Sequence, residues 1–216
     1  SFIMKGKRNP FILFLVIIIG WGLYRYFFKL PEWFDELLAK PIIWLVPTIF
    51  IVKFIEKQAL TSLGFVKTNF LRNCLLGLAL GSVLAAEAIL TKMFKFDGVA
   101  VNPDGLSFFS VILVLGLSFV TGFVEETAFR GYIMNRLWQT FNNEALANLI
   151  STILFVAVHI PLIFFVLHYS LYEAFTYGLI LLVSGAADAF IFARTKSLAA
   201  PVVSHTIWNF AAVMFR

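Results

Sequence analysis

Ionisable and amide side chains stand inside stretches of the chain that are otherwise apolar, and these residues are the first candidates for chemistry. They are Glu125 with Glu126, His159, and His205 with Asn209. A charged side chain at the centre of a membrane helix costs about 2.5–3.5 kcal/mol even on lenient insertion scales, so each one needs a reason. A carboxylate and imidazoles can move protons to and from water, and an amide can donate to a negative oxygen. The set is suited to hydrolysis.

Helical spacing separates the roles of the two glutamates. Residues four apart lie on nearly the same face of a helix, so Glu126 can pair with Arg130, and His205 and Asn209 point the same way. Glu125 is rotated by about 100° from its neighbour and is free to face the histidines. We therefore predict that Glu125 is the general base and that Glu126 and Arg130 support it.

A zinc site is the alternative for the same residues. Two imidazoles and a carboxylate, here His159, His205 and Glu125, can hold zinc and leave a position open for water. The His-Glu-x-x-His spacing of common zinc proteases is absent, however, and the candidate ligands are spread over three apolar stretches. The sequence favours hydrolysis without a cofactor and keeps zinc as the second interpretation.

Four other residues have weaker claims to a site. Glu87 and Asp188 are carboxylates in apolar stretches, which either line a cavity, pair with neighbouring helices or reach a helix end. His168 falls in a short connection and is predicted to lie at the surface. The single cysteine, Cys74, is predicted to be a packed thiol because it stands among apolar residues.

Composition places the whole chain in a bilayer. Of 216 residues, 61% are hydrophobic and 13% are charged, against about 45–50% and about 25% in soluble domains. The net charge of +5 does not indicate nucleic acid, because the basic residues flank apolar stretches and form no continuous polar face. The partner that composition predicts is membrane lipid.

The apolar stretches predict an all-α fold, a polytopic membrane helix bundle of about seven spans, or between six and eight. The expected spans are 11–28, 41–53, 70–94, 106–138, 144–159, 171–194 and 197–215. We expect a polar connection at 29–40, a short interfacial helix within 53–67, a loop at 97–105, and a helix end imposed by Pro161. Residues 1–105 then hold three spans and 106–216 hold the polar motifs, in one integrated membrane domain.

Basic residues predict the orientation of the bundle. Lysines and arginines at the N-terminus, in 53–72, at Arg136 and at Arg194 with Lys196 all fall on one side of a seven-span arrangement. Such residues are enriched on the cytoplasmic side of membranes. We therefore expect a protein of the plasma membrane or an internal membrane, with its N-terminus and the opening of its site facing the cytoplasm.

The motifs in their order along the chain carry a family resemblance. Glu-Glu-x-x-x-Arg, then Phe-x-x-x-His from Phe155, then His-x-x-x-Asn, on separate apolar helices, resembles the CPBP family (CAAX protease and bacteriocin-processing), which includes the type II CAAX prenyl endopeptidases. The resemblance covers about residues 106–215. It implies an intramembrane endopeptidase in which Glu125 and His159 activate water and His205 and Asn209 stabilise the oxyanion. Glu126, Arg130 and Phe155 would support the site, and the substrate would be a peptide or a membrane-associated or lipidated protein, such as a prenylated CAAX protein.

Two other classes of function can be weighed against the protease. A non-catalytic membrane scaffold or immunity-type protein would keep the polar cluster for folding alone. A small transporter would use the same carboxylates to carry protons or substrate, and predicts broken helices and repeat symmetry. The fourth and fifth expected helices show neither, so the protease is favoured.

Overall fold

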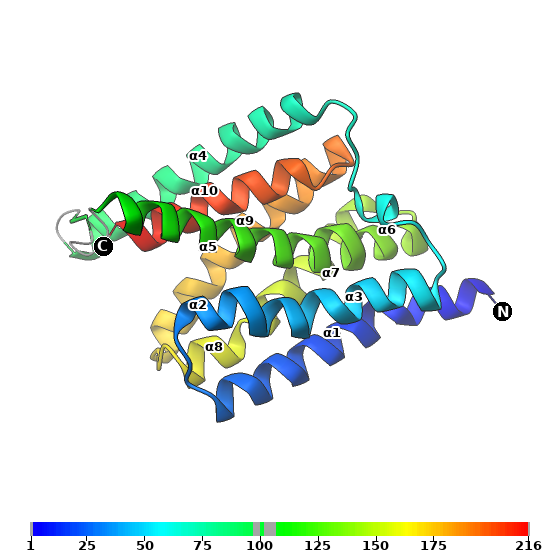
Figure 1. The fold of residues 1–216 in the computed structure, drawn as a ribbon, viewed down its shortest axis with the longest axis horizontal. Helices are drawn as coiled ribbons and strands as arrows, with labels where there is room; N and C mark the ends of the chain where they lie inside the picture. The colour runs from blue at the N-terminus through cyan, green and yellow to red at the C-terminus, as the bar shows by residue number, and fades with distance from the viewer. Residues whose placement is uncertain (1, 97–99, 102–106, 216) are drawn as a thin grey trace.

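Helices make up nearly all of the structure, a computed structural model that describes residues 2–96, 100–101 and 107–215 (Figure 1). Within these ranges, six helical stretches are long and apolar enough to cross a membrane by length and composition. They are Arg8–Phe27, Glu32–Ile55, Phe70–Thr91, Phe108–Phe141, Glu144–Phe165 and Leu171–Thr195. The seventh predicted span is the shorter helix α10, Ala199–Met214. The predicted all-α membrane bundle is confirmed, and most of the loop predicted at 97–105 lies outside the described residues.

The second span (Glu32–Ile55) begins earlier than the sequence suggested. After α1 (Phe2–Phe27), the chain becomes helical again at Glu32, so the predicted polar connection is mostly wrong. The span consists of α2 (Glu32–Phe34), η1 (Asp35–Ala39), η2 (Pro41–Leu45), α3 (Val46–Phe50) and η3 (Ile51–Ile55), where η1, η2 and η3 are π-helical. Its residues Asp35, Glu36 and Lys40 are buried because they pair inside the protein, as Glu36 does with Lys40.

The connection that follows the second span is mostly non-helical. The interfacial helix predicted within 53–67 is reduced to one 3₁₀ turn, η4 (Leu60–Leu63). The chain then enters α4 (Phe70–Phe96), close to the predicted third span.

The longest helical stretch carries the two glutamates in its middle. It consists of α5 (Phe108–Glu126), the π-helical segment η6 (Thr127–Met134) and α6 (Asn135–Phe141). The π-helical geometry begins directly after the glutamates, and π-helical turns are frequent at functional sites. The stretch ends at Asn142, which has left-handed backbone geometry.

The fifth span consists of two helices with a one-residue interruption between them. Helix α7 (Glu144–Val158) stops at His159, and α8 (Ile160–Phe165) continues in its place. The predicted helix end before Pro161 agrees with the end of α7, but the membrane span continues through α8 to Phe165. A proline is tolerated in the first turn of a helix, where its missing N–H has no partner to lose. The following helices are α9 (Leu171–Thr195) and α10.

Helix α10 is held by an unusually close approach of α4, and the two lie side by side in Figure 1. Two glycines of α4, Gly77 and Gly81, face the backbone of α10. A Cβ atom at Gly77 would collide with the Ala200 carbonyl oxygen, and one at Gly81 would lie 2.7 Å from that of Ser204. This Gly-x-x-x-Gly spacing lets two membrane helices pack backbone to backbone, and it places α10 deep in the bundle.

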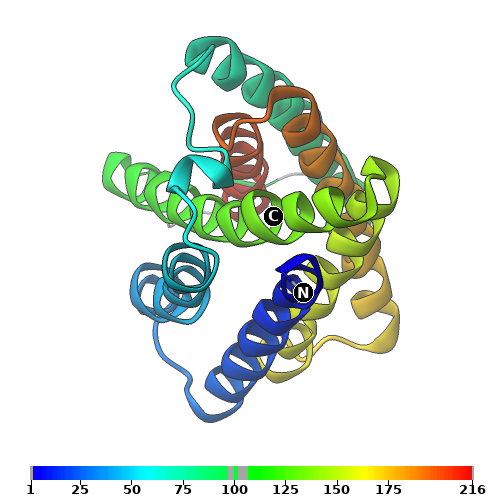
Figure 2. The same cartoon turned by 90° about the vertical axis from the view of Figure 1, so that its right-hand side faces the viewer.

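The two ends of the bundle differ in charge. The N-terminus and the connections around 56–69, 142–143 and 196–198 lie at one end, while the described C-terminal end lies at the other (Figure 1). Figure 2 looks onto the first of these ends. Most, though not all, of the basic residues thus lie at the end of the N-terminus, and that this end faces the cytoplasm remains a prediction.

Candidate active site

Glu125 is the meeting point of four helical segments. Its side chain is 3% exposed. Oxygen Oε1 accepts a hydrogen bond from Lys40 of the second span at 2.9 Å. Oxygen Oε2 lies 3.8 Å from Nε2 of His159 on the fifth span and 3.7 Å from Nε2 of His205 on α10. The structure therefore brings three of the predicted catalytic residues together.

Hydrogen bonds on the far side of each ring fix how the two imidazoles point. His159 Nδ1 lies 2.8 Å from the backbone oxygen of Phe155, and His205 Nδ1 lies 2.8 Å from Oε1 of Glu126. Both partners only accept, which assigns a hydrogen to Nδ1 in each ring. A neutral ring then presents the lone pair of Nε2, and a protonated ring presents an N–H. Both rings turn Nε2 toward Glu125.

The second glutamate belongs to a supporting network, and its predicted pairing with Arg130 is confirmed. Arg130 Nη1 lies 3.1 Å from Oε1 of Glu126, and Nη2 donates to the backbone oxygen of Gly185 on α9 at 2.9 Å. The guanidinium lies over the ring of Phe155, 4.3 Å from its centroid. That ring packs edge-on against His159 with centroids 4.7 Å apart. Phe155 and Arg130 therefore brace the two histidines.

Asn209 does not join this cluster through a hydrogen bond. It lies one turn after His205 on α10 and is partly exposed. Among the described residues, its side chain makes no hydrogen bond to the other six predicted catalytic and supporting residues. Its position one turn beyond His205 matches the predicted spacing, and its role as an oxyanion donor remains a prediction.

The sequence interpretation missed two charged residues of the second span. Lys40 Nζ lies 2.6 Å from Oε2 of Glu36 as well as 2.9 Å from Glu125. Thr121 Oγ1 donates to Oε2 of Glu36 at 2.5 Å. The signal was present in the sequence, because Glu36 and Lys40 stand four residues apart directly before a long apolar stretch. The pairing was missed because residues 29–40 were predicted to be a polar connection and not part of a helix.

A metal ion has candidate ligands, but they already bind cationic side chains. Among the described residues, Glu126, Asp188 and His205 each offer a ligand atom within 4.8 Å of the others. Glu126 is paired with Arg130. The alternative set of Glu125, His159 and His205 includes a carboxylate that binds the Lys40 ammonium. A cation placed in either set would meet a neighbouring positive charge.

Of the remaining candidates, Glu87 and His168 lie apart from this chemistry, whereas Asp188 lies beside Glu126 and His205. Glu87 is half-buried and accepts a hydrogen bond from Thr91 on its own helix at 2.9 Å. His168 is exposed, as predicted. Asp188 is buried on α9, 3% exposed.

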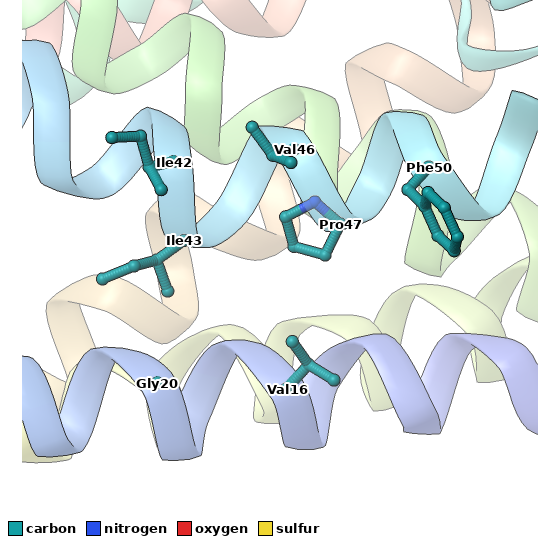
Figure 3. Close-up of a pocket in the computed structure, with 7 residues that line it drawn as sticks. All are labelled: Val16, Gly20, Ile42, Ile43, Val46, Pro47 and Phe50. Carbon is teal, nitrogen blue, oxygen red and sulfur yellow. The ribbon is translucent and has the colours of Figure 1, made fainter.

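An apolar groove of about 470 Å³ lies between α1 and the second span. Figure 3 shows the seven residues that line it: Val16, Gly20, Ile42, Ile43, Val46, Pro47 and Phe50. None of them has a group that could activate water, so this groove is not the site of hydrolysis.

Comparisons with known proteins agree with the motifs. A family model described as type II CAAX prenyl endopeptidase Rce1-like matches residues 107–211, which include Glu125, His159, His205 and Asn209. A comparison with curated proteins gave no match to this chain. Six apolar spans and the family match together identify an integral membrane protein. Residues 107–211 of the chain are thus similar to the Rce1-like family of type II CAAX prenyl endopeptidases, which are membrane proteases.

Proposed function

We propose that the protein hydrolyses a peptide bond inside the membrane with Glu125 as general base. The observation that carries the proposal is the convergence of two Nε2 atoms on Oε2 of Glu125, at 3.8 Å from His159 and 3.7 Å from His205. These distances are too long for direct hydrogen bonds. A water molecule that bonds to Glu125 and to His159 would be activated by both.

The reaction follows from the chemistry of these groups. Glu125 takes one proton of the water while the water oxygen attacks the carbonyl carbon of the scissile bond. This attack gives a tetrahedral oxyanion. His159, held by the Phe155 carbonyl, accepts the second hydrogen bond of the water and orients it. Collapse of the intermediate breaks the C–N bond, and the proton held by Glu125 passes to the leaving amine. Atoms and charges balance without a further reactant.

The oxyanion needs donors, and His205 is suited to be one. The carboxylate of Glu126 at Nδ1 stabilises the protonated ring, whose Nε2–H then donates to the developing charge. We propose that the amide of Asn209, one turn along α10, supplies a second donor when substrate is bound. Removal of one such donor typically costs about 10²–10³ in rate.

The same geometry supports catalysis without a metal. Lys40 and Arg130 supply positive charge at 2.9 Å from Glu125 and 3.1 Å from Glu126. These cations compensate the carboxylates that a zinc ion would otherwise neutralise. We therefore propose a glutamate-dependent protease with no cofactor, and zinc dependence is the competing outcome of the experiment below.

The substrate we propose is a membrane-associated or lipidated protein, and a prenylated CAAX protein is the first to test. The description of the matching family names CAAX prenyl substrates. The basic end of the bundle supports an orientation with the N-terminus and the opening of the site toward the cytoplasm.

The test is cleavage of a quenched fluorescent prenylated CAAX peptide by the purified protein in detergent. Glu125→Gln and His159→Asn are expected to lose activity by at least about 10²-fold, while a zinc chelator leaves the wild type active. His168→Asn is the matched control, because His168 is exposed and has a positive φ of 52° that asparagine tolerates.

Each other outcome has a definite meaning. Full activity of Glu125→Gln would refute the glutamate mechanism. Loss of activity in chelator with recovery on added zinc would establish the metal-dependent version. No Glu125-dependent cleavage of prenylated or unprenylated membrane peptides would favour a scaffold.

A further inference from the structure

Lys40 lies outside residues 107–211, the part of the chain that the family model matches, yet it contacts the predicted base directly. Its side chain is 7% exposed. Nζ lies 5.5 Å from the ring centroid of Trp21 and 5.8 Å from that of Trp44. Aromatic faces at such distances attract an ammonium group. The Lys40 side chain is therefore buried and enclosed by aromatic rings and carboxylates.

Two side-chain hydrogen bonds, one helical turn apart, connect the second span to α5. Glu36 and Lys40 are four residues apart on one helix, and Thr121 and Glu125 are four apart on the other. Thr121 donates to Glu36, and Lys40 donates to Glu125. Residues four apart share a helix face, so the two faces are in register. Glu36 and Thr121 thus fix where the ammonium group of Lys40 can lie.

The position of Lys40 decides which oxygen of Glu125 is available. Lys40 holds Oε1 at 2.9 Å. The other oxygen, Oε2, makes no hydrogen bond to any described residue and faces the two imidazoles. Since Oε2 has no bonded partner among the described residues, both of its lone pairs are available to accept a proton from water.

The charge of Lys40 matters as much as its place. The titratable groups around Glu125 come from each neighbouring element: Glu36 and Lys40, Glu126, His159, Tyr177, Asp188 and His205. Three of these groups are carboxylates, on Glu36, Glu126 and Asp188, and Glu125 is a fourth. Of the two strong cations nearby, Arg130 pairs with Glu126. Among the described residues, Lys40 is the strong cation that lies against Glu125.

We propose that Lys40 is a positioning residue of the hydrolytic site, which keeps Glu125 ionised and turns Oε2 toward the water that it deprotonates. This inference rests on the proposed function. It assigns part of the site to the second span, in the half of the chain where none of the family motifs lie.

The experiment measures kcat/KM against pH for cleavage of the prenylated peptide by three variants and one control variant of the whole 216-residue chain. Lys40→Met keeps the length of the side chain and removes the charge. We expect kcat/KM to fall at least tenfold at neutral pH, with the acid limb of the profile displaced to higher pH, because the carboxylate has lost its cation. Lys40→Arg should recover most of the activity and the wild-type limb.

A further variant tests a displacement of the acid limb in the opposite direction. Glu36→Gln removes the carboxylate that competes for Lys40, so the acid limb should move to lower pH. Lys53→Met is the matched control, since Lys53 is exposed on the same span, and it should leave the profile unchanged. Thermal unfolding in detergent identifies any variant that fails to fold.

The outcomes separate this inference from the function on which it rests. A uniform loss in Lys40→Met at every pH, with no displacement of the limb and no recovery in Lys40→Arg, would overturn the positioning role. So would a profile in Glu36→Gln that does not move. If Glu125→Gln is inactive in the same assay, the protease mechanism stands even when the inference fails. If Glu125→Gln is active, the mechanism itself falls.

Discussion

The two histidines of the site differ in the group that holds Nδ1, and in the proposed mechanism this difference gives the two rings different roles. A backbone carbonyl is neutral, so His159 remains free to be a neutral ring that accepts from water. A carboxylate is charged, so His205 is stabilised as an imidazolium that donates to an oxyanion. The same ring type thus serves two purposes because its second neighbour differs.

The carboxylate of Glu126 should therefore matter through His205. Glu126→Gln retains an oxygen that can accept from Nδ1 but loses the charge. A hydrogen bond to a charged group is worth about 1.5–3 kcal/mol, so we expect kcat to fall roughly 10–100-fold with little change in KM. Steady-state kinetics on the detergent-purified protein measure this.

The control for this variant is Glu144→Gln, which removes a partly exposed ion pair with Arg194 at the start of α7. Such surface pairs contribute little, so its kinetics should match the wild type. Equal kcat values for Glu126→Gln and the wild type would contradict the assignment of His205 as a charged donor.

Sequence reasoning reached some of these residues and not others for a physical reason. Glu125, His159 and His205 stand alone in apolar surroundings, where burial of a polar group demands an explanation. Lys40 stands among Glu32, Asp35 and Glu36, and a cluster of charges is usually solvated. The contact that buries it comes from a helix 85 positions away, which periodicity along the chain cannot reveal.

Among the elements, close helix contacts place the site as much as the polar residues do. Helix α10 approaches α4 at Gly77 and Gly81, and it passes α5 at Gly122, where a Cβ would lie 3.3 Å from that of His205. Small residues on two sides thus set the depth of His205. The lengths of most spans followed from apolar composition. The early start at Glu32 and the continuation past Pro161 did not, because both depend on pairing and packing within the bundle.

Gly81→Ala tests this dependence. The new Cβ would lie 2.7 Å from the backbone oxygen of Ser204 and 2.9 Å from its Cα, so α10 must shift just where His205 follows. Overpacking of this kind costs about 1–3 kcal/mol. We expect a lower melting temperature in detergent and reduced peptide cleavage.

Gly116→Ala is the matched control, because a Cβ there meets nothing within 4 Å. It should keep full activity, and alanine is favoured over glycine in a helix. If both variants behaved alike, helix propensity and not the α4–α10 contact would be responsible.

For the molecule as a whole, the arrangement of charge follows from its path through the bilayer. The described ends of the chain lie at opposite ends of the bundle (Figure 1), and the basic connections share the end of the N-terminus. Positive residues are retained on the cytoplasmic side during insertion. The sequence could predict this asymmetry because it depends on spans and charges alone, without knowledge of how the helices pack.

Labelling of single cysteines tests the orientation. In a Cys74→Ala background, Gln58→Cys places a thiol in the connection after the second span, and Tyr172→Cys places one at the opposite end of the bundle, where the side chain is 79% exposed. A membrane-impermeant maleimide added outside intact cells should label Tyr172→Cys and spare Gln58→Cys. The reverse pattern would invert the predicted topology.

The ion pair between Lys40 and Glu125 also limits what can be removed from this chain or transplanted from it. A fragment that keeps residues 107–211 would retain every motif residue by which the family is recognised. It would lose the ammonium group that neutralises Glu125, and with it Glu36 and the aromatic enclosure around the lysine. The proposed mechanism therefore needs more of the chain than the stretch that the family model matches, and a minimal enzyme designed on that mechanism has to keep the helical span Glu32–Ile55.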